Sequence, residues 1–299
     1  MVSVGTGKYS YKVVEGWGKL PEGYEFGQVA GVATDSQGNV HLFNRSKHPI
    51  QVFDMNGKFL RAWGQGQFAS PHGITIAPDN TYWMVDTDLH QVLKFSSDGK
   101  LQMTLGAKGR PSDTGYSEKD RTVKRAAGPF NRPTKVALGK RGEVYISDGY
   151  GNSRVHKYSS DGKLLMSWGE PGTGPGQFHL PHSIWVDKDE RVLVCDRENH
   201  RIQVFTPEGR YITQWTGFKQ PTDIYIDPSN TVYVSELGDR VSILDLKGNL
   251  LARWGEDKPR SHKPGEFFGA HGIWVCARGD IYVSEVLEGR RVQKFVRST

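Results

Sequence analysis

Histidines recur at one position of a repeated unit in this chain. Six copies of the unit can be aligned by the start of their first strand-like run, and the residue just before that run differs between copies: Ala30, His72, Thr134, His182, Thr222 and His271. A single histidine at a strand entrance is usually a hydrogen-bonded structural residue. Ten histidines scattered over 299 residues would rarely fall on alternate copies of one register, so we weigh metal binding above a purely structural role.

Three further polar residues follow the second strand-like run of their copies. Arg45 holds this place in copy one, Tyr150 in copy three and Arg197 in copy four. The loop after the second strand opens toward one end of the fold, so these side chains are candidates to overhang the histidines. Each also has a structural interpretation, because Arg197 is common in the bare repeat, Tyr150 could cap a sheet, and Arg45 could pair with Asp35 or Asp54.

Other recurring side chains indicate structure more than chemistry. Acidic residues end the second strand in nearly every copy, and hydrogen bonding within the fold is their expected role: Asp86, Asp148, Asp196, Glu236 and Glu285. The remaining seven histidines share no register, and we interpret them as surface or packing residues: His41, His48, His90, His156, His179, His200 and His262.

Each of the first five copies reads as four short strands joined by tight turns. The third strand ends at an apolar residue, and a two-residue turn, a glycine and a fourth strand usually follow, as in Phe53-DMNG-KFLRAWG. The glycine supplies the positive φ that such a hairpin needs. The sixth copy lacks its fourth strand, whereas residues 9–18, YSYKVVEGWG, read as a fourth strand without its first three. We expect this N-terminal strand to complete the sixth copy.

The sequence therefore predicts an all-β protein, a six-bladed β-propeller closed by the N-terminal strand pairing into the last blade. The expected single domain covers 8–299, with a loop inserted at 107–129 and with these blades: 28–64, 69–106, 130–169, 179–217, 218–255, and 267–299 plus 8–18. An open solenoid is the competing fold, and it leaves the displaced N-terminal strand unexplained.

The propeller would bring the three register histidines together. The first strand of each blade is innermost, and blades of a six-fold ring are about 60° apart, so alternate blades are about 120° apart. Three imidazoles would then converge from His72, His182 and His271. Three protein ligands with an open fourth position are typical of catalytic zinc, so we expect Zn²⁺ or another divalent metal.

Composition narrows the range of partners. Lys and Arg number 39 against 33 Asp and Glu, a net charge of +6 that suits a small anionic substrate. Much of the excess lies in 108–125, which we interpret as a solvated loop and not as a nucleic-acid-binding arm. We expect no membrane partner, a monomer, and a cytoplasmic location, because there is no signal-peptide pattern and Cys195 and Cys276 read as small buried hydrophobes.

Several stretches carry a family resemblance. The run DRENHRIQVF at 196–205 resembles NHL-repeat propellers. Three longer stretches resemble the peptidyl-α-hydroxyglycine α-amidating lyases, zinc propellers of NHL type: SPHGITIAPDNTYWMVDTDLHQVLKF (70–95), ISDGYGNSRVHKYS (146–159) and HLPHSIWVDKDERVLVCDRENHRIQVF (179–205). The resemblance implies zinc ligation by the three register histidines, a base at Tyr150, and anion binding by Arg45 and Arg197.

The resemblance also implies a reaction, the cleavage of an α-hydroxyglycine-type carbinolamide, or a close small anionic analogue, to an amide and glyoxylate. Tyr150 would take the proton of the α-hydroxyl, whose pKa zinc lowers, and the amide nitrogen would leave. Gly269 and Gly272 replace a Met and an Asp beside the family's third histidine, which argues against a structural Ca²⁺. Gly151 replaces a disulfide-forming cysteine, which is consistent with a reducing compartment.

Two other functions remain open. A metal-dependent hydrolase such as a lactonase would use the same metal with hydroxide as nucleophile, although such propellers usually need carboxylate ligands and none occupies the histidine register. A non-enzymatic NHL module would bind protein or RNA through a basic or aromatic outer face, and it would not need three histidines at the axis.

Overall fold

The computed structural model describes residues 2–255 and 260–298, and almost all of their regular structure is β-strand. The chain forms two compact units, the first from Met1–Gln67 with Thr222–Thr299 and the second from Phe68–Pro221, and each is described by itself. Thr299, the last residue of the expected sixth blade, lies outside the described residues. So do residues 256–259, which the expected single domain also includes. The blade boundaries and the single domain stay predictions.

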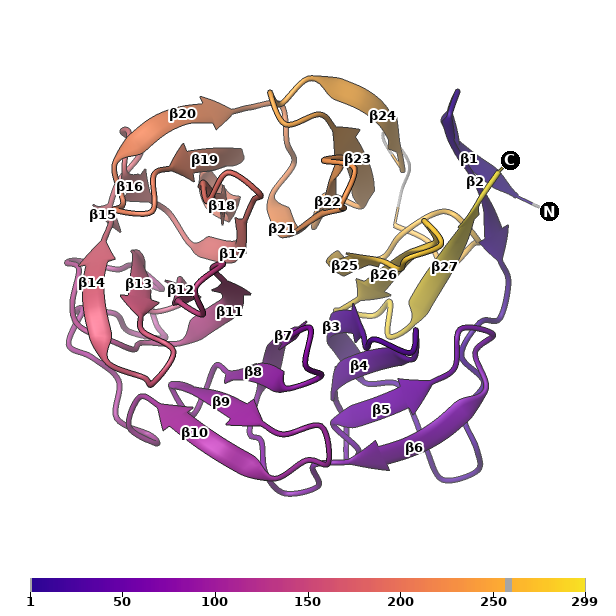
Figure 1. Cartoon of the computed structure of the whole chain (residues 1–299), viewed down its shortest axis with the longest axis horizontal. Helices are drawn as coiled ribbons and strands as arrows, with labels where there is room; N and C mark the ends of the chain where they lie inside the picture. Colours follow the sequence, from indigo (N-terminus) through magenta and orange to yellow (C-terminus); the bar gives the residue numbers. More distant parts are fainter. Residues whose placement is uncertain (1, 256–259, 299) are drawn as a thin grey trace. The chain divides into compact units, whose positions relative to one another are not determined.

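The second unit contains three four-stranded antiparallel sheets (Figure 1). Their strands are β7 Pro71–Ile76, β8 Tyr82–Asp86, β9 Gln91–Phe95 and β10 Leu101–Leu105; β11 Pro133–Leu138, β12 Val144–Asp148, β13 Arg154–Tyr158 and β14 Leu164–Trp168; β17 Pro181–Val186, β18 Val192–Asp196, β19 Arg201–Phe205 and β20 Tyr211–Trp215. A short parallel pair, β15 Glu170–Pro171 and β16 Gln177–Phe178, precedes the third sheet, and a 3₁₀ turn at Arg197–Asn199 interrupts it.

The first unit holds the other three sheets. Their strands are β3 Gln28–Thr34, β4 Val40–Arg45, β5 Ile50–Phe53 and β6 Phe59–Trp63; β21 Pro221–Ile226, β22 Val232–Glu236, β23 Arg240–Leu244 and β24 Leu250–Trp254; β25 Ala270–Val275, β26 Ile281–Glu285, β27 Val292–Arg297, β2 Tyr9–Val14 and β1 Ser3–Thr6. The six sheets are the blades of a six-bladed β-propeller, as the sequence predicts. No helix of the described residues has the length and hydropathy needed to cross a bilayer.

The N-terminal strand completes the last blade. β2 pairs antiparallel with β27, and the register places Val13 opposite Phe295 and Lys12 opposite Val296. This pairing confirms the closure expected from the displaced Trp-Gly strand. β1, which the sequence did not predict, folds back on β2 and adds a fifth strand to the sheet.

Burial falls from the first strand of a blade to the fourth. Every residue of β7 is buried, whereas β10 in the same sheet is mostly exposed. The apolar core lies between neighbouring sheets, where Val85 and Val92 pack with Val136 and Ile146 of the next blade. A strand buried on both faces holds its backbone and polar side chains rigidly, so residues at the ends of first strands are well placed to form a site.

The hairpins between third and fourth strands follow the expected turn chemistry. In the first blade, Asp54 accepts hydrogen bonds from the main-chain N–H of Asn56 and of Lys58 at 2.8 and 2.9 Å. Gly57 has a φ of 87°, in the left-handed region that residues other than glycine rarely adopt. This three-residue loop ending in a left-handed glycine sets the register of β5 against β6.

The acids that end the second strands are structural, as expected. Asp86 accepts hydrogen bonds from the main-chain N–H of Ala69 and Leu89 at 2.6 and 3.0 Å, so it fixes the entrance to its blade. Asp148 lies 3.1 Å from His156 Nε2 and is fully buried with it. His156 therefore belongs to the packing class assigned from the sequence.

Two other histidines outside the register bond the main chain just before the first strand of the next blade. His90 Nδ1 accepts the main-chain N–H of Arg132 at 3.0 Å, and His200 Nδ1 accepts that of Gln220 at 3.1 Å. An accepting Nδ1 needs a neutral ring. Burial lowers the pKa of His90, which keeps its ring in this accepting form at neutral pH.

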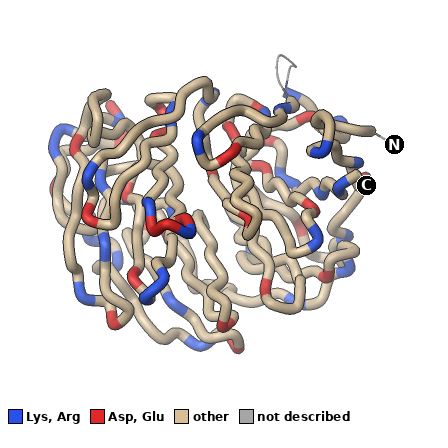
Figure 2. The backbone as a smooth tube through the Cα atoms, turned by 45° about the horizontal axis from the view of Figure 1, so that its top comes forward, with Lys and Arg blue, Asp and Glu red and all other residues tan. Residues whose placement is uncertain are grey.

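The inserted loop is less solvated than the sequence indicates. Lys and Arg are interspersed with Asp and Glu along both units (Figure 2). Residues 107–129 form no strand and are largely exposed. Thr114, however, is only 1% exposed, and its hydroxyl donates to the carbonyl of Gly151 at 2.6 Å. The loop is therefore docked on the connection that follows β12.

We predict that the closing strand is essential for stability. Tyr11 is fully buried in the core of the last blade, whereas its neighbour Lys12 is exposed. Tyr11→Ala should lower the free energy of unfolding by about 3–5 kcal/mol, because it removes a large buried ring and leaves a cavity. Urea unfolding measures this loss, and Lys12→Ala is the matched control. Equal, small effects of the two changes would show that β2 is not part of the packed blade.

Candidate functional site

Tyr150 lies between two of the register histidines in the second unit. Its hydroxyl oxygen is 3.1 Å from His72 Nε2 and 3.0 Å from His182 Nε2. The two imidazole centroids are 4.7 Å apart, and the rings are 2% and 1% exposed. The structure therefore brings together three residues that were singled out from their register alone.

The strands explain how these side chains meet. His72 and His182 are the second residues of β7 and β17, so they lie inside the strands and not just before them as the sequence alignment suggested. Tyr150 follows the end of β12, and its main-chain N–H donates to the carbonyl of Arg132 at 3.2 Å. β11 packs against both β7 and β17, which places the Tyr150 connection between the two histidines.

A main-chain carbonyl fixes the tautomer of His72. Its Nδ1 lies 2.7 Å from the carbonyl oxygen of Thr134, the residue at the same register in the next copy. A carbonyl only accepts, so Nδ1 carries the hydrogen and Nε2 of the neutral ring carries a lone pair. In the first unit, His271 Nδ1 lies at the same 2.7 Å from the carbonyl of Ala30, again the register residue of the next copy.

Both nitrogens that face Tyr150 are within hydrogen-bond distance of its hydroxyl oxygen. The Tyr150 O–H can donate to the lone pair of His72 Nε2, and the phenol oxygen can accept from His182 Nε2 where that nitrogen carries the hydrogen. Neutral imidazoles are ordinary ligands of zinc and related divalent metals, and a carbonyl at Nδ1, as His72 and His271 have, is a common second contact of such ligands. The donor set therefore fits a metal ion at this place.

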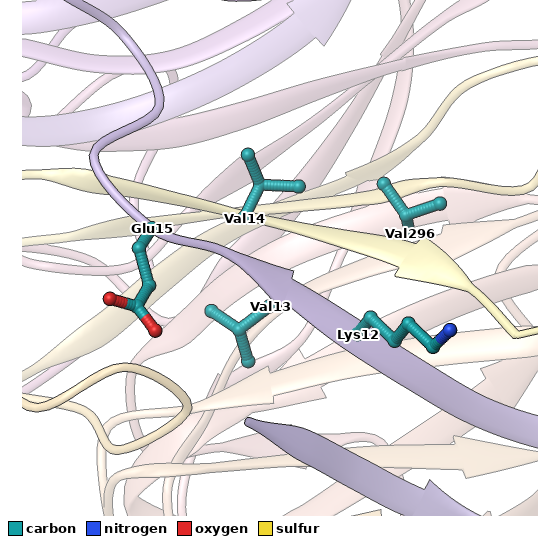
Figure 3. A pocket seen from close by; sticks show the side chains of 5 residues that line it. All are labelled: Lys12, Val13, Val14, Glu15 and Val296. Atoms are coloured by element: carbon teal, nitrogen blue, oxygen red, sulfur yellow. The ribbon is translucent and has the colours of Figure 1, made fainter. Parts of the chain in front are cut away.

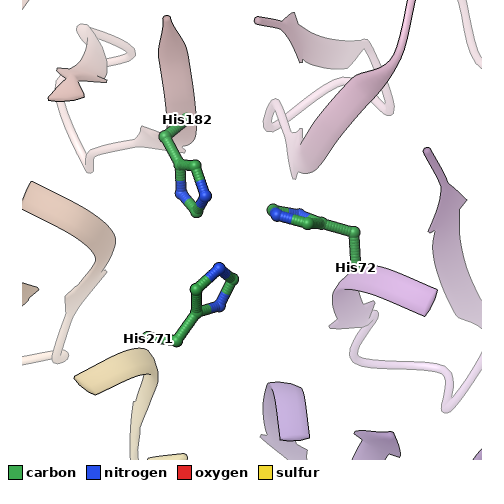
Figure 4. Close-up of side chains that lie close together, drawn as sticks. All are labelled: His72, His182 and His271. Carbon is green, nitrogen blue, oxygen red and sulfur yellow. The ribbon is translucent and has the colours of Figure 1, made fainter. Parts of the chain in front are cut away.

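Figure 4 draws the three register imidazoles, which come from β7, β17 and β25. His72, His182 and His271 are all buried, and each can offer one ring nitrogen to a metal ion. His271 lies in the first unit, as does Arg45, whose Nη1 donates to Gln28 Oε1 at 2.9 Å at the end of β4. The roles assigned to these residues from the sequence stay predictions.

Arg197 contacts Tyr150. Its guanidinium carbon is 5.4 Å from the centroid of the Tyr150 ring, and Nη1 is 3.4 Å from the hydroxyl oxygen. Its Nε donates to Glu198 Oε1 at 2.8 Å. Burial is the largest single influence on Glu198 and opposes its ionisation, but the charge of Arg197 together with hydrogen bonds from Gln220 and Arg197 lowers the pKa of that carboxyl. The ion pair holds the guanidinium on the tyrosine ring.

Sequence reasoning missed a second guanidinium at Tyr150. The guanidinium carbon of Arg132 is 5.9 Å from the ring centroid of Tyr150. The sequence did contain an indication of this residue. Two residues before the register position, the six copies have Gln28, Ser70, Arg132, Leu180, Gln220 and Gly269. Arg132 is the one charged residue in that series, and it lies in the blade that carries Tyr150.

A cavity in the first unit offers little chemistry. It measures about 520 Å³ and lies at the end of β2, where Figure 3 shows the side chains of Lys12, Val13, Val14, Glu15 and Val296. Three of these are valines, and the lysine and glutamate carry opposite charges. The candidate site is therefore placed at Tyr150, where several functional groups converge.

Comparisons with known proteins show what the chain is related to. The NHL repeat family matches residues 130–158 and 178–205. The chain carries NHL repeats. It is also homologous to the peptidyl-α-hydroxyglycine α-amidating lyases, being 29% identical to lyase 2 of Drosophila melanogaster over 95% of this chain and 75% of that protein. The two NHL matches contain Tyr150, His182 and Arg197.

Other relatives share only part of their length with the chain. NHL repeat-containing protein 3 of Homo sapiens is 37% identical over 72% of this chain and 62% of that protein. Peptidyl-glycine alpha-amidating monooxygenase B of Xenopus laevis is 34% identical over 63% of this chain, which spans 24% of that longer protein. A solved structure described as a putative gluconolactonase has a TM-score of 0.65 at 14% identity and 93% coverage of both chains, which shows a common fold.

The contact between Arg197 and Tyr150 can be measured as a coupling free energy. Arg197→Ala and Tyr150→Leu, made singly and together in metal-free protein, should lower the free energy of unfolding by less than the sum of the single effects. We expect a coupling of about 0.5–2 kcal/mol from the cation–π contact. The control pair is Arg197→Ala with Tyr116→Leu, because the Tyr116 hydroxyl bonds Arg132 instead. A coupling of zero in urea unfolding would contradict the geometry.

Proposed function

We propose that this protein is a metal-dependent lyase that cleaves an α-hydroxyglycine-type carbinolamide, or a close small anionic analogue, to an amide and glyoxylate. The observation that carries the proposal is the Tyr150 hydroxyl, held at hydrogen-bond distance from His72 Nε2 and His182 Nε2 with a guanidinium on its ring. Homology to the amidating lyases supports the same chemistry.

His72, His182 and His271 would hold the metal, and zinc is the ion that a set of three imidazoles favours. Their shared register, their burial and the identical carbonyl contacts of His72 and His271 support this assignment. When bound, a divalent ion acts as a Lewis acid that lowers the pKa of the substrate hydroxyl.

Tyr150 would act as the base and the arginines as anion holders. As a phenolate, Tyr150 would take the α-hydroxyl proton on Oη, the C–O bond would become the carbonyl of glyoxylate, and the C–N bond would break. The amide nitrogen would leave with the bonding pair and take that proton back from Tyr150 Oη, so the step restores the phenolate and needs no oxidant. Arg197 and Arg45 would bind the carboxylate and the developing oxyanion, since guanidinium groups suit both.

The two alternative functions, a hydrolase and a non-enzymatic binding module, differ from the lyase in their products or in their need for a metal. A lactonase would release no glyoxylate, and a module that binds protein or RNA would need no bound metal. The small anionic substrate, the monomeric state and the cytoplasmic location remain proposals.

Metal content is the first test. We expect protein purified without added metal to contain about one divalent ion per chain, and His72→Ala and His182→Ala to lose it, because each removes one of three ligands. Elemental analysis measures the content, and His200→Ala is the control because the His200 ring accepts the main-chain N–H of Gln220 and does not belong to the histidine register. Wild-type protein that holds no ion and takes up none on titration would contradict the proposal.

Glyoxylate release tests the reaction. With α-hydroxyhippurate as substrate, Tyr150→Phe should slow release by about 10²–10⁴-fold while the metal content stays unchanged, because a general base contributes that much. Tyr211→Phe on the outer strand β20 is the matched control. Wild-type release no greater than that of His182→Ala would overturn the lyase assignment, and parallel loss of metal and activity in Tyr150→Phe would make Tyr150 structural.

A further inference from the structure

The inserted loop is fixed to the connection that carries Tyr150. The Thr114 hydroxyl donates to the carbonyl of Gly151 at 2.6 Å, and Asn131 Nδ2 donates to that hydroxyl at 3.1 Å. The main-chain N–H of Lys124 donates to the carbonyl of Thr114 at 3.0 Å. Thr114 thus holds both the Tyr150 connection and the return arm of the loop.

Arg132 makes a second attachment. Its Nη1 donates to the Tyr116 hydroxyl at 3.3 Å and contacts Glu118, both in the insertion, while Nη2 donates to Asp88 Oδ1 at 2.7 Å. The same guanidinium faces the Tyr150 ring. Within the described part of the chain, its buried Nε has no hydrogen-bond partner. The guanidinium therefore links the insertion to the tyrosine of the candidate site.

Between the insertion and Tyr150 lies a cavity of about 280 Å³. The insertion contributes Arg121 to Val123, and the opposite wall includes Phe178 and Leu180 beside Tyr150. Phe178 is fully buried, and the carbonyl of Leu180 accepts the main-chain N–H of Arg197 at 3.1 Å. The cavity thus shares Tyr150 with the candidate site, and a hydrogen bond joins its wall at Leu180 to Arg197.

The size and chemistry of the cavity limit what it can take. Its volume of about 280 Å³ lies just below the roughly 300–1,000 Å³ of small-molecule pockets, so it suits one compact group and not a long chain. Val123, Phe178 and Leu180 make its walls apolar in part. Arg121 and His179, the ionisable lining residues besides Tyr150, are both exposed. An uncharged ring or a short branched group matches these walls.

We propose that this cavity is a subsite for a compact apolar group on the amide side of the substrate, such as an aromatic acyl group. The inference rests on the proposed function, which places the anionic end of the substrate at the histidines and arginines. The acyl end then extends past Tyr150 under the insertion. The loop at 107–129 interrupts an otherwise regular repeat at this point, and its docking gives the subsite a fixed wall.

Binding of two unreactive ligands tests the subsite without any turnover. N-Benzoylglycine and N-acetylglycine share their carboxylate and amide and differ only in the acyl group. Calorimetric titration of metal-loaded protein should give tighter binding of the benzoyl ligand by roughly tenfold or more, because its ring is buried in the cavity. Val123→Trp should abolish this preference by filling the cavity, whereas Lys119→Trp, exposed in the same insertion, should keep it.

Equal binding of the two ligands by wild-type protein, or a benzoyl preference that survives in Val123→Trp, would overturn the proposal. A milder variant, Val123→Ala, guards against a folding defect, since it should fold normally and weaken only the benzoyl ligand. Because the titration requires no chemistry, its failure is distinct from failure of the lyase assignment, which glyoxylate release decides separately.

Discussion

The candidate site depends on one contact, the hydrogen bond from a histidine Nδ1 to a main-chain carbonyl of the next blade. His72 makes it to Thr134 and His271 makes it to Ala30, each at 2.7 Å. The contact ties the ring to a strand that is buried on both faces, and it fixes the tautomer so that Nε2 has the lone pair. Tyr150 meets two rings in register because β7 and β17 both pack on β11.

The residues that alternate with histidine at the register position also hold neighbouring blades together. Threonines at the intervening positions also bridge to the next blade, since the Thr134 hydroxyl donates to Pro181 and the Thr222 hydroxyl donates to Ala270. Histidine and threonine therefore perform the same bridging task. Only the imidazole has a second nitrogen, and for His72 that nitrogen is directed to Tyr150. The bridge accounts for a side-chain donor at His72, Thr134, Thr222 and His271, whereas Ala30 at the same register has no such donor. What a histidine adds to a threonine at this place is the second ring nitrogen.

Much of the fold could be predicted from the sequence because the repeat sets strand order, and a missing strand has to come from the other end of the chain. The pairing of Val13 with Phe295 confirms that inference. The site was predictable only where copies differ at an equivalent position, as at His72, Tyr150 and Arg197. Arg132 differs too, but an arginine before a strand is common on surfaces, and its contact with Tyr150 depends on a left-handed backbone that spacing does not reveal. The docking of Thr114 lay in a segment without periodicity, so no pattern indicated it.

Cobalt substitution tests most directly whether the histidines that flank Tyr150 hold a metal. Co²⁺ in a four-coordinate site of nitrogen and oxygen ligands absorbs visible light far more strongly than the hydrated ion. The account predicts that titrating metal-free protein with Co²⁺ gives this intense band, that the band saturates at about one ion per chain, and that His72→Ala abolishes it. A titration that yields only the weak spectrum of hydrated Co²⁺ would contradict the account.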